Sequence, residues 1–198
     1  MTDRSPRIGL FGGTFDPIHV GHVELASVVR TELALDRMLV VVANDPWQKR
    51  DRPVSPAEDR FALVEAALAD RVGLEPSRLE IDRGGPSYTV DTVREVVLDD
   101  PGAEVFVVIG ADVLGQLETW HAADDLRKLA TIVVVDRPGA RLVEPPRGWR
   151  VVRVTVDPVD VSSTGLRSAL EAGAPVDGLV PDAVIRGIAE RGLYAEGR

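Results

Sequence analysis

Short apolar runs alternate along the chain with longer segments of helical periodicity. The runs are rich in β-branched residues and almost continuously apolar, which is typical of strands buried on both faces of a parallel sheet. We expect five such strands, at Ile8–Phe11, Met38–Ala43, Glu104–Ile109, Thr131–Val135 and Trp149–Val154. The other segments predict six helices, at about Val20–Ala34, Pro56–Asp70, Thr89–Leu98, Ala123–Ala130, Thr164–Ala172 and Pro181–Arg191.

Strand–helix alternation of this kind predicts an α/β fold with right-handed crossovers. We expect a single Rossmann-like, doubly wound domain over residues 1–198, with a parallel sheet of about five or six strands. Ligands of such sheets bind at the carboxyl ends of the strands. Around Pro56, Ser55 and Glu58 have the spacing of a capping box at the start of the second helix. Two charged segments that contain proline, Asp45–Val54 and Arg137–Arg147, are expected to be surface loops.

Composition narrows the class of protein. The chain has no cysteine, which excludes disulfides and thiolate chemistry. No apolar run approaches the roughly 20 residues that a membrane helix needs, and the polar first residues lack a signal-peptide pattern. We therefore expect a cytoplasmic protein. The net charge of −9 argues against nucleic-acid binding but leaves a small anionic ligand open, because a local basic pocket overrides the global sign.

A first candidate motif, Gly12 to His22, follows the first strand directly. Gly12 and Gly13 allow close approach of the backbone to a ligand, and the helix that starts near His19 offers free N–H groups to a phosphate. His19 and His22 share one face of its first turn, so both imidazoles can address one phosphoryl group. The alternatives are a plain tight turn and ordinary helical histidines. Zinc is disfavoured because cysteine is absent and the third histidine, His121, is distant.

A second candidate motif, Val161 to Arg167, opens a late helix. Its serine and threonine residues are natural N-caps, and capping alone is the alternative interpretation. Arg167 lies in the first turn, where a cation opposes the helix dipole. Its placement makes sense if an anion binds alongside.

Together these two strings resemble the two signatures of the H-x-G-H nucleotidyltransferase superfamily, in which an acceptor phosphate attacks the α-phosphorus of ATP. The resemblance implies that His19 and His22 hold the α- and β-phosphates, while Lys49 and Arg167 neutralise the leaving pyrophosphate. It assigns ATP binding to the glycine-rich loop, the end of the third expected strand and the second motif: Gly12, Gly13, Thr14, Phe15, Gly110, Asp112, Ser162, Ser163 and Thr164.

Three further stretches resemble the nicotinate-mononucleotide adenylyltransferase family. In Ser87–Thr92, the resemblance implies that the backbone N–H groups of Tyr88 and Thr89 receive the nicotinate carboxylate, which suits a helix N-terminus. The alternative is that Ser87 simply caps a helix. In Ile109–Trp120, it implies that Trp120 stacks on the pyridine ring, with a core tryptophan as the alternative. The ending, from Val180 to Tyr194, is assigned only to packing.

The chain departs from the family in two places. Trp47 and Gln48 replace the usual Pro-His before Lys49, and His121 follows Trp120 where many relatives carry a second aromatic residue. The roles of Trp47, of loop 45–54 and of Asp16 are left open by the sequence.

The implied function is transfer of the adenylyl group of ATP to nicotinate mononucleotide, giving nicotinate adenine dinucleotide and pyrophosphate in NAD biosynthesis. Mg²⁺ is expected to enter with ATP, held by phosphate oxygens and water, with no metal site of the protein's own. The partners are then these two nucleotides, with neither nucleic acid nor membrane. The alternatives are the same chemistry on nicotinamide mononucleotide or phosphopantetheine, and a non-catalytic nucleotide-binding domain. The oligomeric state stays open, with a homo-oligomer as one alternative.

Overall fold

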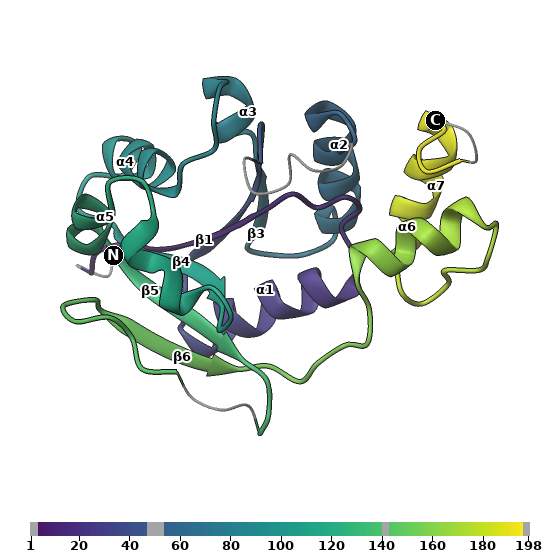
Figure 1. Ribbon diagram of the computed structural model, residues 1–198. Coiled ribbons are helices and arrows are strands. Elements are labelled where there is room, and N and C mark those ends of the chain that lie inside the picture. Colours follow the sequence, from purple (N-terminus) through teal and green to yellow (C-terminus); the bar gives the residue numbers. More distant parts are fainter. Residues whose placement is uncertain (1–3, 47–53, 140–142, 196–198) are drawn as a thin grey trace.

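A computed structural model describes residues 4–46, 54–139 and 143–195, and its described strands form one sheet (Figure 1). The strand order is β3-β2-β1-β4-β5-β6, and every neighbouring pair is parallel. The expected doubly wound α/β fold of about five or six strands is therefore confirmed. The strands are β1 (Arg7–Gly13), β2 (Arg37–Val42), β3 (Leu74–Ser77), β4 (Glu104–Gly110), β5 (Ala130–Asp136) and β6 (Val151–Thr155).

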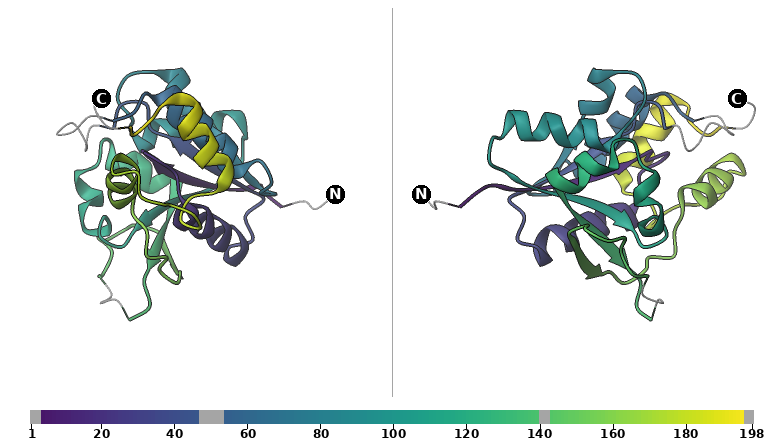
Figure 2. Two further views of the ribbon diagram at one scale, coloured as in Figure 1. Left: turned by 90° about the vertical axis from the view of Figure 1, so that its right-hand side faces the viewer. Right: turned by 60° about the vertical axis from the view of Figure 1, so that its left-hand side comes forward.

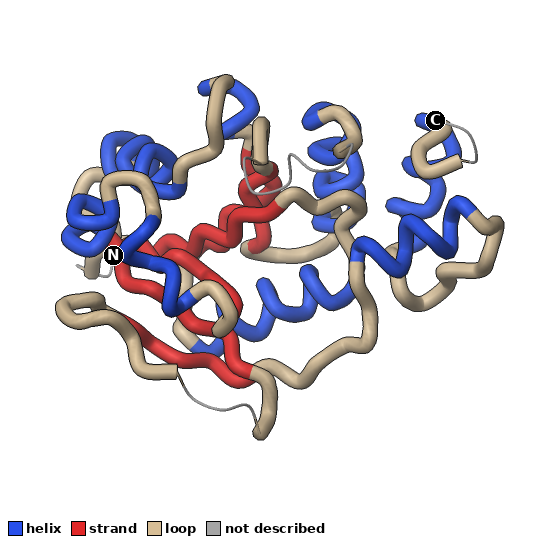
Figure 3. Tube along the Cα trace, viewed as in Figure 1, coloured by secondary structure: helices blue, strands red, loops and turns tan. Residues whose placement is uncertain are grey.

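Helices cover both faces of this sheet (Figures 2 and 3), and two separate apolar clusters bury its two sides. One cluster packs helices α1, α2, α6 and α7 against the strands, and the other packs α4, α5 and the 3₁₀ helix η2. All six expected helices are present. The helices are α1 (Val20–Glu32), α2 (Ala57–Leu68), α3 (Leu79–Arg83), α4 (Thr89–Asp99), η2 (Leu114–Thr119), α5 (Ala123–Leu129), α6 (Ser163–Glu171) and α7 (Asp182–Arg191). None of the helices in the described ranges is long and apolar enough to span a bilayer.

The structure adds α3 and η2, which were not expected from the sequence, and it changes three other local features. β3 was not expected because it has four residues, includes Pro76 and lies at the edge of the sheet, where proline is tolerated. β6 begins at Val151, later than expected, because Trp149 packs into the second cluster and donates its indole N–H to Glu118 Oε1 at 2.7 Å. The capping box is wrong, since no side chain caps α2; the carbonyl of Ser55 instead accepts a hydrogen bond from the guanidinium of Arg60.

The strand order reverses between β1 and β4. β1 runs beside β2 on one side and beside β4 on the other, and the chain leaves these two strands at Gly13 and Gly110. A crevice at the carboxyl ends of two such strands is where ligands of open α/β sheets bind. Both glycine-containing segments singled out in the sequence therefore lie at one place in the fold.

Candidate functional site

The loop from β1 to α1 is shaped by its two glycines and by Phe15. A Cβ on Gly12 would meet no atom within 4 Å, whereas a Cβ on Gly13 would lie 2.6 Å from the ring of Phe15. Phe15 itself has φ 49°, a left-handed conformation that bulky residues rarely adopt. Its ring is held edge-on against Phe11 at 5.4 Å and against His22 at 5.1 Å. The loop thus leaves open space above Gly12 and fixes the ring of His22.

His19 and His22 form a stacked pair at the start of α1. Their ring centroids are 3.6 Å apart, and His22 Nδ1 accepts the backbone N–H of His19 at 3.3 Å. Because Nδ1 of His22 is the acceptor in this hydrogen bond, Nε2 is the ring nitrogen that can carry an N–H. Burial lowers the pKa of His19 from 6.5 to about 4, so this ring is neutral at pH 7. The pair lies at the first turn of α1, where the N–H of Val20 donates to the carbonyl of Leu179 at 3.1 Å and the N–H of His22 donates to the carbonyl of His19 at 3.0 Å.

The second motif lies against this loop. The hydroxyl of Ser163 donates to the carbonyl of Pro17 at 3.0 Å, and Nη1 of Arg167 donates to the carbonyl of Asp16 at 2.7 Å. These bonds span 146 and 151 positions of sequence. They bring the N-terminus of α6 beside the histidine pair. Part of the unusual placement of Arg167 is explained by this carbonyl.

The first turn of α6 is capped as the sequence indicated. The side chain of Ser162 accepts the N–H of Gly165 at 3.1 Å, and the hydroxyl of Thr164 accepts from Arg167 at 3.2 Å. In the part of the chain that the structure describes, the N–H groups of Ser163 and Thr164 make no hydrogen bond. They are therefore available to an anion.

A buried cation that the sequence analysis did not single out supports the loop from behind. Arg60 is 1% exposed and donates to the carbonyls of Thr14 at 2.8 Å, Ser55 at 2.7 Å and Asn44 at 3.4 Å. Burial lowers the pKa of Arg60, and the charge of Asp16 offsets part of that effect. Its only sequence signal was a charge within the apolar stripe of α2.

Asp16, whose role the sequence left open, is part of the same interior. It is 2% exposed, and its Oδ1 accepts the hydroxyl of Tyr194 at 2.7 Å. Burial raises the pKa of Tyr194, which keeps that hydroxyl a donor at neutral pH. Tyr194 was assigned only to packing from the sequence, so this hydrogen bond to the first motif is an addition.

A cavity of about 290 Å³ opens at the carboxyl ends of β1 and β4. Much of its wall is aliphatic, contributed by β1, β2 and β4. The indole Nε1 of Trp120 is buried without a hydrogen-bond partner among the described residues, and the ring of Tyr88 stacks on His121 at 4.2 Å. The polar, glycine and aromatic residues of the lining are Phe11, Gly12, Gly13, Thr14, Glu80, Tyr88, Thr89, Thr92, Gly110, Trp120 and His121.

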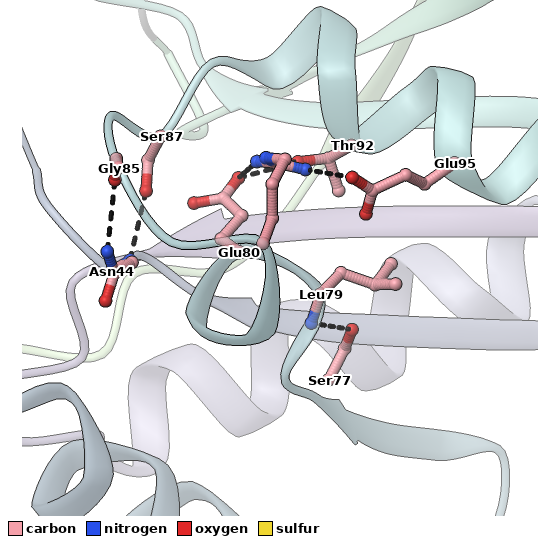
Figure 4. Close-up of polar contacts among 9 residues, drawn as sticks. Asn44, Ser77, Leu79, Glu80, Gly85, Ser87, Thr92 and Glu95 are labelled. Carbon is pink, nitrogen blue, oxygen red and sulfur yellow. Dashed lines mark hydrogen bonds and ion pairs between the residues drawn. The ribbon is translucent and has the colours of Figure 1, made fainter.

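The N-terminus of α4 opens toward this cavity. The helix starts at Thr89 with Tyr88 as its N-cap residue and with no side-chain cap. The alternative that Ser87 caps it is wrong, because the hydroxyl of Ser87 instead accepts the N–H of Asn44 at 3.0 Å (Figure 4). Within the described ranges, the N–H groups of Tyr88 and Thr89 make no hydrogen bond. An anion in the cavity would find them free.

The remaining candidate residues are distributed around these features. Asp112 is exposed beyond the end of β4, and its carboxylate lies over Gly110, where a Cβ would clash with it. A second cavity, of about 620 Å³, lies beside α6, and its lining includes Arg137, Ser162 and Leu179.

Lys49 and its neighbours lie outside the described residues. Among residues 4–46, 54–139 and 143–195, no three His, Asp or Glu side chains are grouped to hold a metal ion.

Comparison with known proteins shows the family to which the chain belongs. A family model described as cytidylyltransferase-like matches residues 10–169. The chain is 44% identical over 192 residues to a probable nicotinate-nucleotide adenylyltransferase of Corynebacterium kroppenstedtii, covering 96% of this chain and 91% of that protein. It is also 44% identical over 193 residues to a protein of the same name from Saccharopolyspora erythraea, with the same coverage.

Among solved structures, the fold is similar to that of Plasmodium falciparum nicotinic acid mononucleotide adenylyltransferase complexed with NaAD. The TM-score is 0.79 at 15% identity, over 96% of this chain and 97% of the other. A putative nicotinate-nucleotide adenylyltransferase from Vibrio parahaemolyticus gives a TM-score of 0.68 at 21% identity, over 97% of each chain. At these identities the likeness supports the fold.

Proposed function

The chain belongs to the cytidylyltransferase-like family and, within it, to the nicotinate-nucleotide adenylyltransferases, and from this we propose that it transfers the adenylyl group of ATP to nicotinate mononucleotide. The products are nicotinate adenine dinucleotide and pyrophosphate, as a step of NAD biosynthesis. One observation carries the proposal: Ser163 and Arg167 donate to the carbonyls of Pro17 and Asp16, which joins the two candidate motifs into one site.

The chemical step needs positioning more than acid–base catalysis. The acceptor's phosphate is already largely ionised near pH 7, so no general base has to remove a proton. One of its oxygens attacks the α-phosphorus of ATP, and the bond from that phosphorus to the bridging oxygen breaks as pyrophosphate leaves. His19 and His22 donate N–H hydrogen bonds to the α- and β-phosphates, where charge builds up in the transition state. The stacking of the pair and the burial of His19 support this role, because they hold the rings in place before substrate binds.

The leaving pyrophosphate is received at the second motif. Arg167 and the first N–H groups of α6, at Ser163 and Thr164, supply positive charge and donors, with Ser162 capping the turn. We assign the same role to Lys49. Mg²⁺ enters with ATP as part of that substrate, bound by phosphate oxygens and water. Backbone and side chains of the first loop and the end of β4, from Gly12 to Phe15 and at Gly110 and Asp112, complete the ATP site.

The acceptor's ring occupies the cavity at the end of β4. Trp120 lines that cavity and stacks on the pyridine ring, and the N–H groups of Tyr88 and Thr89 receive the carboxylate. A carboxylate at a helix N-terminus is favoured over a neutral amide by the helix dipole. This is the physical basis that we propose for preferring nicotinate mononucleotide over nicotinamide mononucleotide.

We further propose that the protein acts in the cytoplasm as a single domain, with neither nucleic acid nor a membrane as a partner. Its net charge of −9 supports the exclusion of nucleic acid.

The test is pyrophosphate release from ATP and Mg²⁺ with nicotinate mononucleotide, nicotinamide mononucleotide and phosphopantetheine in parallel. We expect kcat/KM to be about 10-fold or more higher for nicotinate mononucleotide, equivalent to about 1.4 kcal/mol of transition-state discrimination. Equal use of the amide would remove the role of the α4 N-terminus while leaving the chemistry intact. Reaction with phosphopantetheine alone would replace the acceptor, and no reaction with any of the three would refute the enzymatic function.

A further inference from the structure

One acidic side chain stands out in the lining of the acceptor cavity, as far as the described residues go. Of the described residues that line it, Glu80 is the one acidic residue, and these lining residues include no lysine or arginine. Most of the wall is aliphatic, and its remaining polar side chains are hydroxyls, the indole of Trp120 and the imidazole of His121. Glu80 is 8% exposed, so its carboxylate is largely shielded from bulk water.

Contacts on the far side of the carboxylate hold it in place (Figure 4). Glu80 Oε1 accepts the hydroxyl of Thr92 at 2.9 Å and lies 4.0 Å from Nη2 of Arg83. The same guanidinium donates to Glu95 Oε1 at 2.9 Å. One arginine therefore serves two carboxylates, and the three side chains together carry a net charge of −1.

The second carboxylate oxygen of Glu80, Oε2, has no hydrogen-bond partner among the described residues. This oxygen points away from Thr92 (Figure 4). A carboxylate beside an apolar cavity is poorly solvated, and its field reaches farther there than in water. A cavity of this kind favours a ligand with positive charge.

The acceptor's ring carries such a charge. When the nitrogen of a pyridine ring is bonded to ribose it is quaternary, so the ring is a permanent cation whatever the substituent on its carbon atoms. We propose that Glu80 makes the cavity selective for a positively charged pyridinium ring over an uncharged ring of the same shape. The aromatic faces of Trp120 and Tyr88 act in the same direction through cation–π attraction. This inference rests on the proposed function for the identity of the acceptor.

The substrate's own carboxylate is not an obstacle to this arrangement. Its proposed site is the N-terminus of α4, at Thr89, whereas Glu80 is bonded to Thr92 one helical turn further along the same face. The negative substituent is thus placed at the positive end of the helix, and the positive nitrogen lies within reach of the carboxylate.

The experiment compares two acceptors with wild type and with Glu80→Gln. One acceptor is nicotinate mononucleotide, and the other is its C-nucleoside analogue, in which a phenyl ring bonded to the ribose 5-phosphate keeps the 3-carboxylate but lacks the positive charge of the ring nitrogen. For wild type we expect kcat/KM to be about 10-fold higher with the charged ring. In Glu80→Gln, which still offers an oxygen to Thr92, we expect the two acceptors to differ by less than about 3-fold, with the KM for ATP unchanged.

Glu95→Gln is the matched control. It removes the same charge from the same arginine, but Glu95 does not line the cavity. This variant is expected to keep the wild-type preference for the charged ring. Loss of the preference in Glu95→Gln as well would overturn the assignment to Glu80.

Three other results would also overturn it. Equal losses with both acceptors in Glu80→Gln would show that the residue only positions α3 and α4. A gain with nicotinate mononucleotide would show that repulsion of the substrate's carboxylate dominates. Equal use of both acceptors by wild type would refute the inference by itself. This comparison needs no variant, so it remains decisive if Glu80→Gln does not fold. Failure of wild type to adenylylate nicotinate mononucleotide would instead refute the proposed function, and the affinities of the two acceptors, measured by calorimetry, would still test Glu80.

Discussion

His19 couples the stability of the fold to pH, because the burial that leaves it as a neutral donor also opposes its protonation. Its pKa is lowered by burial from 6.5 to about 4. Above pH 6.5 the ring is neutral in both the folded and the unfolded chain, and stability is unaffected. As the pH falls below 6.5 the unfolded chain takes up a proton that the folded chain does not accept until about pH 4, so stability is lost through that window.

The size of the effect follows from the two pKa values. Between pH 7 and pH 5 the difference in proton uptake costs about 2 kcal/mol for a fully shielded ring, and screening by solvent reduces this to about 1–2 kcal/mol. His19→Gln cannot titrate and should not lose this amount. Other groups titrate in both proteins, so the difference between wild type and variant isolates His19.

Urea denaturation of both proteins at half-unit steps from pH 7 to pH 5 measures it. The quantity to follow is the free energy of unfolding of wild type minus that of the variant. This difference should decrease by about 1–2 kcal/mol as the pH falls from 7 to 5. A difference that stays flat would mean that His19 has an ordinary pKa in the folded protein, and that the interpretation of His19 as a neutral donor is wrong.

Three further substitutions test the network and the cavity. Arg60→Met removes the donor to three loop carbonyls and should cost about 2–4 kcal/mol in urea denaturation, while exposed Arg186→Met should cost less than about 0.5 kcal/mol. Tyr194→Phe leaves the buried carboxylate of Asp16 without its phenolic donor and should cost about 1–2 kcal/mol by the same method. Trp120→Ala should raise the KM for nicotinate mononucleotide about 10-fold or more and leave that for ATP unchanged in steady-state assays; equal rises in both would place Trp120 outside the acceptor site.

Elements that bury a periodic apolar face were predictable from the sequence. The five expected strands and six expected helices all pack against one of the two clusters, so their pattern of apolar residues is the pattern of burial. β3 and α3 were missed because they are too short to show a periodic pattern. β3 has four residues, one of them Pro76, and α3 has five. The two signature strings were recognisable because each is local, and their convergence followed from the doubly wound topology.

Long-range polar contacts were not predictable. Arg60 contacts three carbonyls in two loops, Glu80 contacts Thr92 on another helix, and Tyr194 reaches Asp16 over 178 positions. No local pattern encodes such pairs, because each partner has an ordinary surface interpretation of its own. Such pairs form only when the fold removes these groups from water, because a polar group buried in the interior needs a hydrogen-bond partner there.

The central claim is that adenylyl transfer occurs at the histidine pair joined to the N-terminus of α6. Measuring dinucleotide and pyrophosphate formation from ATP, Mg²⁺ and nicotinate mononucleotide, with wild type and His22→Ala side by side, tests it most directly. The account predicts equal amounts of both products from wild type, and turnover about 100-fold lower or more in the variant, as for loss of one transition-state donor. Near-normal turnover in His22→Ala would contradict it, because the chemistry would then take place without the residue at its centre.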